Sequence, residues 1–217
     1  MVIEIVLSGF LFLFIIVLNI ISTQFGYETF SDLNAQVKLQ KIGNNPKKFK
    51  TALALIVVEH FALIALAVML FFAFSSYSII LAVVWTVSRS LEALMQIYYK
   101  KRYWGLSSLA KQYSRANDAE KTSLVDSTRS VLKTKNTVFV VAQVLFSIGT
   151  LAYSFLFVTQ TTVVPDFLGW FGIIASVIYG VGSGVNIFKP DFRAIWNVGG
   201  LLIFVFELIL GGYLLFV

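Results

Sequence analysis

Five ionisable side chains of this chain lie inside long apolar stretches, where chemistry by charged groups is least expected: Glu59, His60, Arg89, Glu92 and Glu207. A charge at the centre of a membrane-spanning helix costs about 2.5–3.5 kcal/mol on insertion scales. Arg89 and Glu92 are three residues apart, a spacing at which two side chains share one face of a helix and can pair. We therefore expect this pair to anchor both helix packing and any binding site.

Two interpretations of these charges follow. In the first, the five side chains line a polar cavity that binds a ligand or an ion. The glutamates would then bind a cation, a proton or an amine, and Arg89 would orient an anionic group or keep a carboxylate charged. In the second, Arg89 pairs with Glu92 or Glu59 and serves only to hold the spanning helices together.

His60 is the single histidine of the chain. Adjacent helical residues point about 100° apart, so Glu59 and His60 do not form a chelating pair, and we predict no metal and no cofactor. His60 is then either a hydrogen-bonded core residue or part of a proton relay. Glu207 has no obvious partner in sequence; it would carry a proton in a proton-coupled carrier, or accept a hydrogen bond from Asn197 or a serine.

The composition indicates an integral membrane protein. Hydrophobic residues make up 58% of the 217 residues and charged residues only 13%, whereas soluble domains have about 25% charged residues. The sequence has no cysteine, which excludes disulfides and thiol chemistry. It also has no H-E-x-x-H, G-x-S-x-G or Walker motif, so an enzyme is the less favoured class.

The apolar runs predict an all-α, polytopic protein with a single transmembrane domain over residues 1–217. Six spans are expected, at about residues 2–21, 51–74, 79–98, 137–158, 167–188 and 195–217.

The two longest polar segments predict helices outside the spans. Residues 29–42 place Phe30, Leu33 and Val37 on one face, opposite Asp32, which favours an amphipathic helix at the membrane surface. Residues 100–136 predict a helical hairpin, too small to be an independent domain. Its second helix begins at Asn117, an N-cap with Glu120 three residues later.

Basic residues predict the orientation. Of the 17 lysines and arginines, five fall between spans one and two, nine between spans three and four, and two between spans five and six. The positive-inside rule then places loops one, three and five in the cytoplasm and both termini outside the cell membrane. This pattern accounts for the basic net charge without nucleic acid as a partner, and anionic membrane lipids are the expected contacts of these residues.

Small residues in the fifth span predict close helix approach. Gly180 and Gly184 form a small-xxx-small pair that favours helix packing, and an exposed glycine face here would allow a homo-oligomer.

Two short motifs carry a resemblance to a known family. The third span contains R-x-x-E-A at Arg89, Glu92 and Ala93, and the start of the fifth contains P-x-x-L-G at Pro165, Leu168 and Gly169. In these motifs, in length and in span number the chain resembles an uncharacterised prokaryotic membrane family, domain of unknown function 4386. The resemblance implies six spans and supplies no established activity.

The favoured function is a small carrier, a channel or a substrate-binding membrane subunit with a polar cavity in the inner half of the membrane, taking a small molecule or an ion. One alternative is a non-catalytic scaffold or regulator whose buried charges are structural. The other is an intramembrane enzyme that processes a lipid.

Overall fold

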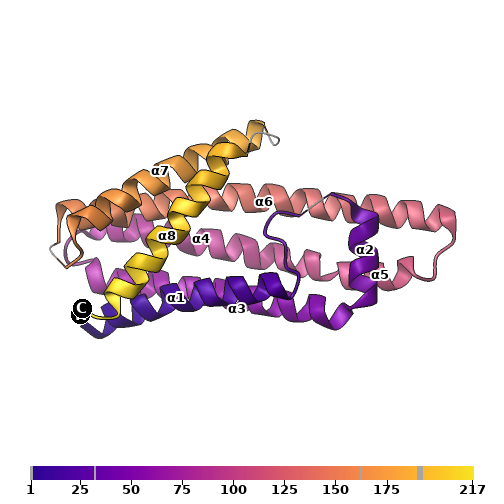
Figure 1. The fold of residues 1–217 in the computed structure, drawn as a ribbon, viewed down its shortest axis with the longest axis horizontal. Helices are drawn as coiled ribbons and strands as arrows, with labels where there is room; N and C mark the ends of the chain where they lie inside the picture. The colour runs from indigo at the N-terminus through magenta and orange to yellow at the C-terminus, as the bar shows by residue number, and fades with distance from the viewer. Residues whose placement is uncertain (1, 32, 162, 190–192) are drawn as a thin grey trace.

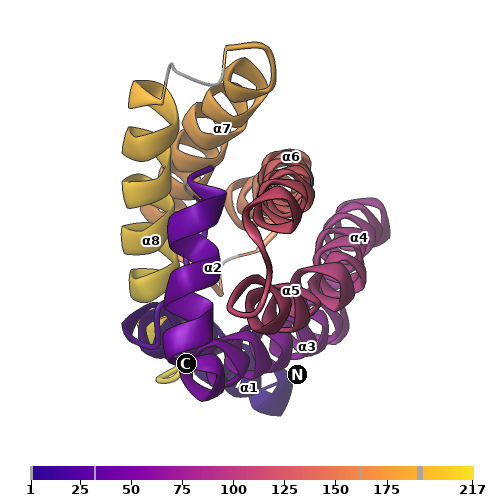
Figure 2. The same ribbon diagram turned by 90° about the vertical axis from the view of Figure 1, so that its right-hand side faces the viewer.

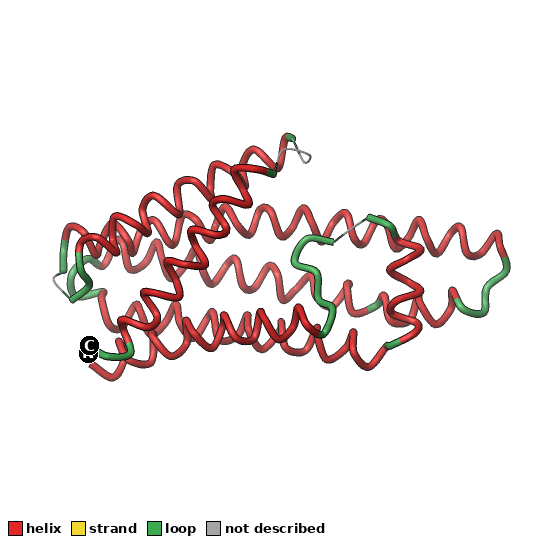
Figure 3. The backbone as a smooth tube through the Cα atoms, in the orientation of Figure 1, coloured by secondary structure: helices red, strands yellow, loops and turns green. Residues whose placement is uncertain are grey.

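The computed structural model describes residues 2–31, 33–161, 163–189 and 193–217. Within these ranges the chain forms eight helices and no strand. Their bounds are α1 Val2–Gln24, α2 Ala35–Asn44, α3 Pro46–Phe74, α4 Ile79–Trp104, α5 Leu106–Tyr113, α6 Asp118–Thr159, α7 Asp166–Phe188 and α8 Ala194–Leu214 (Figures 1 and 3). The helices α1, α3, α4, α6, α7 and α8 supply six segments long and apolar enough to cross a membrane, which confirms the predicted all-α polytopic class.

The long helices run side by side, with α1 against α3, α4 against α6 and α6 against α7. The helix α8 crosses this layer obliquely, from α1 at one end to α7 (Figure 1). Glycines allow α8 to approach both α1 and α7 closely. A Cβ at Gly9 would come within 2.8 Å of the Gly211 carbonyl oxygen, and one at Gly199 within 2.6 Å of the Tyr179 Cα.

The two ends of the bundle differ. The start of α1 and the end of α8 lie together at one end, whereas α2 and α5 lie across the other (Figures 1 and 2). We call the end with α2 and α5 the basic end, because most lysines and arginines lie in and beside these helices. The helix α6 reaches far into it: its 42 residues are about 63 Å long, roughly twice the hydrocarbon thickness of a bilayer.

The single helix α6 therefore combines the expected fourth span with the second helix of the expected hairpin. Its start is as predicted. Asn117 accepts a hydrogen bond from the Glu120 backbone N–H, and the Glu120 carboxylate accepts one from the Asn117 N–H. This capping box satisfies backbone donors that the first turn of a helix leaves without partners.

The helix expected at residues 29–42 is wrong in its start. The helix α2 begins at Ala35 after the N-cap Asn34, and it buries Ala35, Leu39 and Ile42. Leu33 and Val37, expected on the apolar face, are 44% and 39% exposed, and Asp32 lies outside the described residues. The buried face of α2 packs on protein, because Leu39 belongs to the same apolar cluster as Tyr103 and Leu132.

Three buried apolar clusters stabilise the bundle, and polar residues separate the two largest along α3. Along α3, the cluster at the basic end stops at Ile56 and the second cluster begins at Ala62. Glu59 and His60 lie between the two clusters. The fold thus places two of its buried ionisable side chains between the two clusters of α3.

Candidate functional site

A cavity of about 270 Å³ lies beside Glu59 and His60. All five ionisable residues singled out in the sequence line it, and they come from three helices: Glu59 and His60 from α3, Arg89 and Glu92 from α4, and Glu207 from α8. We call it the acidic cavity. That it binds a ligand or an ion stays a prediction.

Arg89 is at the centre of the charged groups. Its Nη1 donates to the Glu92 Oε2 at 2.6 Å, so the pair expected from the three-residue spacing is present. Its Nη2 lies 4.0 Å from the Glu207 Oε1, which gives Glu207 a partner that the sequence did not suggest. The guanidinium carbon also lies 4.2 Å from the centre of the Phe146 ring, and the side chain is buried.

Glu59 pairs with its neighbour instead of Arg89. The His60 Nδ1 lies 2.6 Å from the Glu59 Oε2 and 2.6 Å from the Ile56 carbonyl oxygen. The two side chains leave the helix in different directions, as expected, but the flexible glutamate turns back towards the ring. His60 Nε2 has no hydrogen-bond partner among the described residues. Among all the residues that the structure describes, no group of three or more histidine, aspartate or glutamate side chains is arranged to hold a metal ion.

Acidic side chains outnumber basic ones in the acidic cavity. Three carboxyl groups, one guanidinium and one imidazole line it. Buried charge without compensation is costly, so this arrangement favours an occupant that brings positive charge or a proton.

Polar groups that the sequence analysis did not single out complete the lining. The Tyr179 hydroxyl on α7 donates to the Gln143 Oε1 on α6 at 2.8 Å, which fixes the amide beside the cavity. Tyr27 and Thr29, from the loop between α1 and α2, line it at the basic end. Tyr179 lies one residue before Gly180 in the predicted span. A tyrosine at this position has no sequence signature that would mark it as a lining residue.

The acidic cavity reaches the surface between α1 and α8. Its lining includes Asn19 and Ile20 on α1 and Phe204 on α8, and all three are exposed. These two helices meet closely at Gly9 and Gly211 and diverge towards the basic end (Figure 1). Of the three glutamates, Glu207 has the most exposed side chain, at 14%.

Buried lysines at the basic end were missed by the sequence analysis, which expected anionic membrane lipids as the contacts of these residues. Lys100 donates to the Tyr27 hydroxyl at 2.5 Å, and Lys135 donates to the backbone carbonyls of Glu28 and Thr29 at 2.7 and 2.8 Å. We call Lys38, Lys100, Lys135, Tyr27 and Glu28 the lysine cluster; in it, Lys38 lies 2.8 Å from the Glu28 carboxylate. Burial raises the pKa of the Tyr27 phenol well above its ordinary value, so the phenol is neutral.

The two glycines of the predicted small-xxx-small pair have different surroundings. A side chain at Gly180 would come within 3.0 Å of the Ser147 Cβ on α6, so this position packs closely. A side chain at Gly184 would meet no atom within 4 Å, so Gly184 is not a packing position within the chain. Gly182 is one, because a Cβ there would lie 2.6 Å from the Trp196 backbone nitrogen.

Six apolar helices around buried ionisable side chains define a multi-pass helical membrane protein. The chain belongs to the family of DUF4386, domain of unknown function, whose model matches residues 7–217. This match confirms the resemblance carried by the Arg89 and Pro165 motifs. No curated protein and no solved structure matches the chain.

Proposed function

We propose that this protein is a small carrier of the cell membrane that binds a small organic cation in the acidic cavity. The observation that carries the proposal is the excess of three glutamates over one arginine around a buried space of about 270 Å³. The charge pattern of the loops supports an orientation with the basic end in the cytoplasm and both termini outside.

The size of the cavity favours a compact occupant. It has room for about nine water molecules at ~30 Å³ each. Sites for drug-sized ligands are generally larger, about 300–1,000 Å³. A small quaternary or protonated ammonium ion fits the space.

The glutamates have different roles in this proposal. Glu207 is the first carboxylate that an incoming cation meets, because it is the most exposed and its contact with Arg89 is long, 4.0 Å. Glu92 makes the short contact with Arg89 and holds the guanidinium in place beside the cavity. Glu59 and His60 share the proton that leaves when the cation enters, which makes the carrier an exchanger of cation for proton.

The proposal is tested by uptake of labelled tetramethylammonium into proteoliposomes with an acidic interior, so that protons leave as the cation enters. This probe is permanently charged and crosses lipid slowly without a protein. We expect uptake by the wild type and at least tenfold less by Glu207→Gln, while Asp126→Asn, an exposed carboxylate on α6, stays at the wild-type rate. Equal uptake by all three proteins and by empty liposomes would sink the proposal.

One observation favours a second candidate function, that of a scaffold whose buried charges only hold helices together. Arg89 packs tightly on α6, because a side chain at Gly149 would come within 3.0 Å of the Arg89 Cγ. Native mass spectrometry in mild detergent separates the two candidates. A small cation that stays with the wild type and leaves folded Glu92→Gln supports the carrier; unfolding of both Arg89→Ala and Glu92→Gln, with nothing retained, supports the scaffold.

A further inference from the structure

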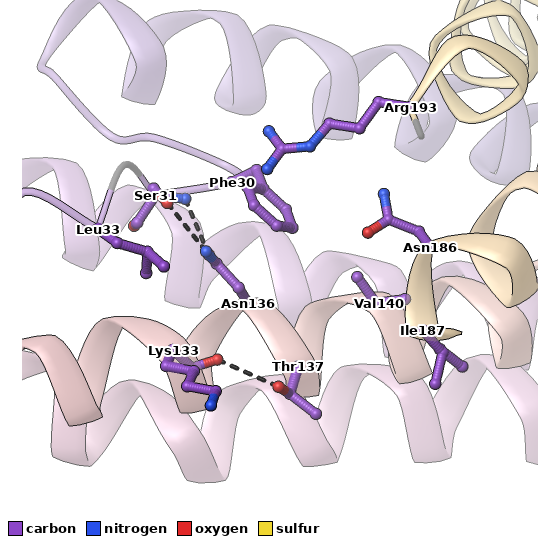
Figure 4. Close-up of a pocket in the computed structure, with 10 residues that line it drawn as sticks. All are labelled: Phe30, Ser31, Leu33, Lys133, Asn136, Thr137, Val140, Asn186, Ile187 and Arg193. Atoms are coloured by element: carbon purple, nitrogen blue, oxygen red, sulfur yellow. Dashed lines mark hydrogen bonds between the residues drawn. The ribbon is translucent and has the colours of Figure 1, made fainter. Parts of the chain in front are cut away.

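A second and larger cavity, of about 620 Å³, lies at the basic end and shares no lining residue with the acidic cavity. Its lining comes from α6, the end of α7, the start of the chain leading into α8, and the loop between α1 and α2 (Figure 4). We call it the Asn186 groove. Its ten lining residues are Phe30, Ser31, Leu33, Lys133, Asn136, Thr137, Val140, Asn186, Ile187 and Arg193.

The amide of Asn186 points to a ligand. The side chain is 3% exposed, and its Nδ2 has no hydrogen-bond partner among the described residues. In Figure 4 the amide extends from α7 into the space in front of Phe30. A buried donor without a partner costs about 1–3 kcal/mol, and an acceptor brought by a ligand would remove this cost.

The basic side chains of the groove favour an anion. Among the described residues that line it, Lys133 and Arg193 are basic and none is acidic. The Arg193 guanidinium carbon lies 4.1 Å from the centre of the Phe30 ring. Stacking of this kind holds the flat guanidinium in place, and its N–H groups donate in the plane of the group, in the fork that matches a phosphate.

Asn136 gives the groove a fixed wall. Its amide accepts from the Ser31 N–H at 2.9 Å and donates to the Ser31 carbonyl oxygen at 2.9 Å. These two bonds attach the loop to α6 and place Phe30 beneath Arg193, as Figure 4 shows.

The apolar surroundings indicate that the anion belongs to a lipid. Val140, Ile187 and Leu33 line the groove, and Ile187 and Leu33 are each 44% exposed. Phe188, the last residue of α7, is 85% exposed. Since α7 ends here while α6 continues into the basic end, the groove lies where a spanning helix meets the headgroup region (Figure 1). A headgroup in the groove would place its acyl chains along the exposed apolar side of α7.

We propose that the Asn186 groove binds the phosphate group of an anionic phospholipid, with Asn186 and Arg193 as donors and Lys133 at its rim. The inference does not depend on the carrier proposal, because the two cavities have separate linings. The loop between α1 and α2 contributes different residues to the two cavities, Tyr27 and Thr29 to the acidic cavity and Phe30 and Ser31 to the Asn186 groove.

Native mass spectrometry of the full chain in mild detergent tests the proposal, with phosphatidylglycerol as the probe. Diacylglycerol, which has no phosphate, and glycerol phosphate, which has no acyl chain, distinguish the source of the binding. The variants are Arg193→Gln, at an exposed position, and Asn186→Leu; the matched control is Arg129→Gln, an exposed arginine on α6.

We expect the wild type and Arg129→Gln to retain phosphatidylglycerol, and both groove variants to bind it about tenfold more weakly. Should Asn186→Leu fail to fold, the result for Arg193→Gln decides. Retention of diacylglycerol to the same extent as phosphatidylglycerol overturns the proposal, because the groove would then be only apolar. Binding of glycerol phosphate as tightly as phosphatidylglycerol also overturns it, in favour of a soluble phosphate ester.

Discussion

Lys135 and Arg89 are equally buried, each 2% exposed, but their surroundings differ. Lys135, in the lysine cluster, donates to two backbone carbonyls of the loop between α1 and α2. Arg89, in the acidic cavity, faces the carboxylates of Glu92 and Glu207. The lysine is satisfied by groups that belong to the fixed backbone, whereas the arginine is outnumbered by side chains that can exchange protons or partners.

Under the carrier proposal, this difference separates buried charge that holds the fold together from buried charge that binds a ligand. In the lysine cluster the Tyr27 hydroxyl and the loop carbonyls of Glu28 and Thr29 accept hydrogen bonds from buried lysines of the chain itself. In the acidic cavity the His60 Nε2 has no hydrogen-bond partner within the described part of the chain, and acidic side chains outnumber basic ones. A binding site needs polar groups that are still without a partner, because these groups can interact with a ligand.

The largest expected effect is the removal of Arg89. Arg89→Met should lower the free energy of unfolding by about 3–5 kcal/mol, because it leaves buried carboxylates without their counter-charge. Adding Glu92→Gln should restore part of this loss. Thermal or denaturant unfolding in detergent measures both, and a double variant no more stable than Arg89→Met would show that the carboxylates are not the cause.

Removal of Lys135 should have a somewhat smaller effect. Lys135→Met leaves the Glu28 and Thr29 carbonyls without a donor and should cost about 2–3 kcal/mol of unfolding free energy. Arg129→Met, at an exposed cation on the same helix, should change it by less than about 0.5 kcal/mol. Equal stability of the two variants would contradict the structural role of the lysine cluster.

The smallest effect concerns Tyr27 and pH. Because burial raises the pKa of its phenol in the folded state, its contribution to stability is present below the unfolded pKa of about 10 and is lost as pH rises above it. The difference in unfolding free energy between the wild type and Tyr27→Phe should therefore shrink between about pH 9 and pH 11. A difference that stays constant over this range would mean that Tyr27 titrates alike in both states.

The sequence predicts most reliably what depends on neighbours along the chain. The Arg89–Glu92 pair and the Asn117 capping box are each set within three residues of one helix, and both are present. The six apolar helices follow from composition in the same way.

What the sequence did not predict depends on contacts between distant segments. Lys135 is buried by a loop 106 and 107 residues earlier in the chain, so no local pattern marks it. The same contacts hold residues 28–31 in a non-helical form, which delays the start of α2 to Ala35. Whether Gly180 or Gly184 meets a neighbour depends on how α6 and α7 cross, and a spacing of four residues does not specify that crossing.

The continuity of α6 has a mechanical consequence. Gln143 borders the acidic cavity, and Asn117 caps the far end of the same helix, about 39 Å away at 1.5 Å per residue. A straight helix of this length behaves as a lever arm: a tilt of about 5° around Gln143 moves the tip by about 3 Å. A small tilt of α6 beside the cavity would thus be amplified at the tip of the basic end.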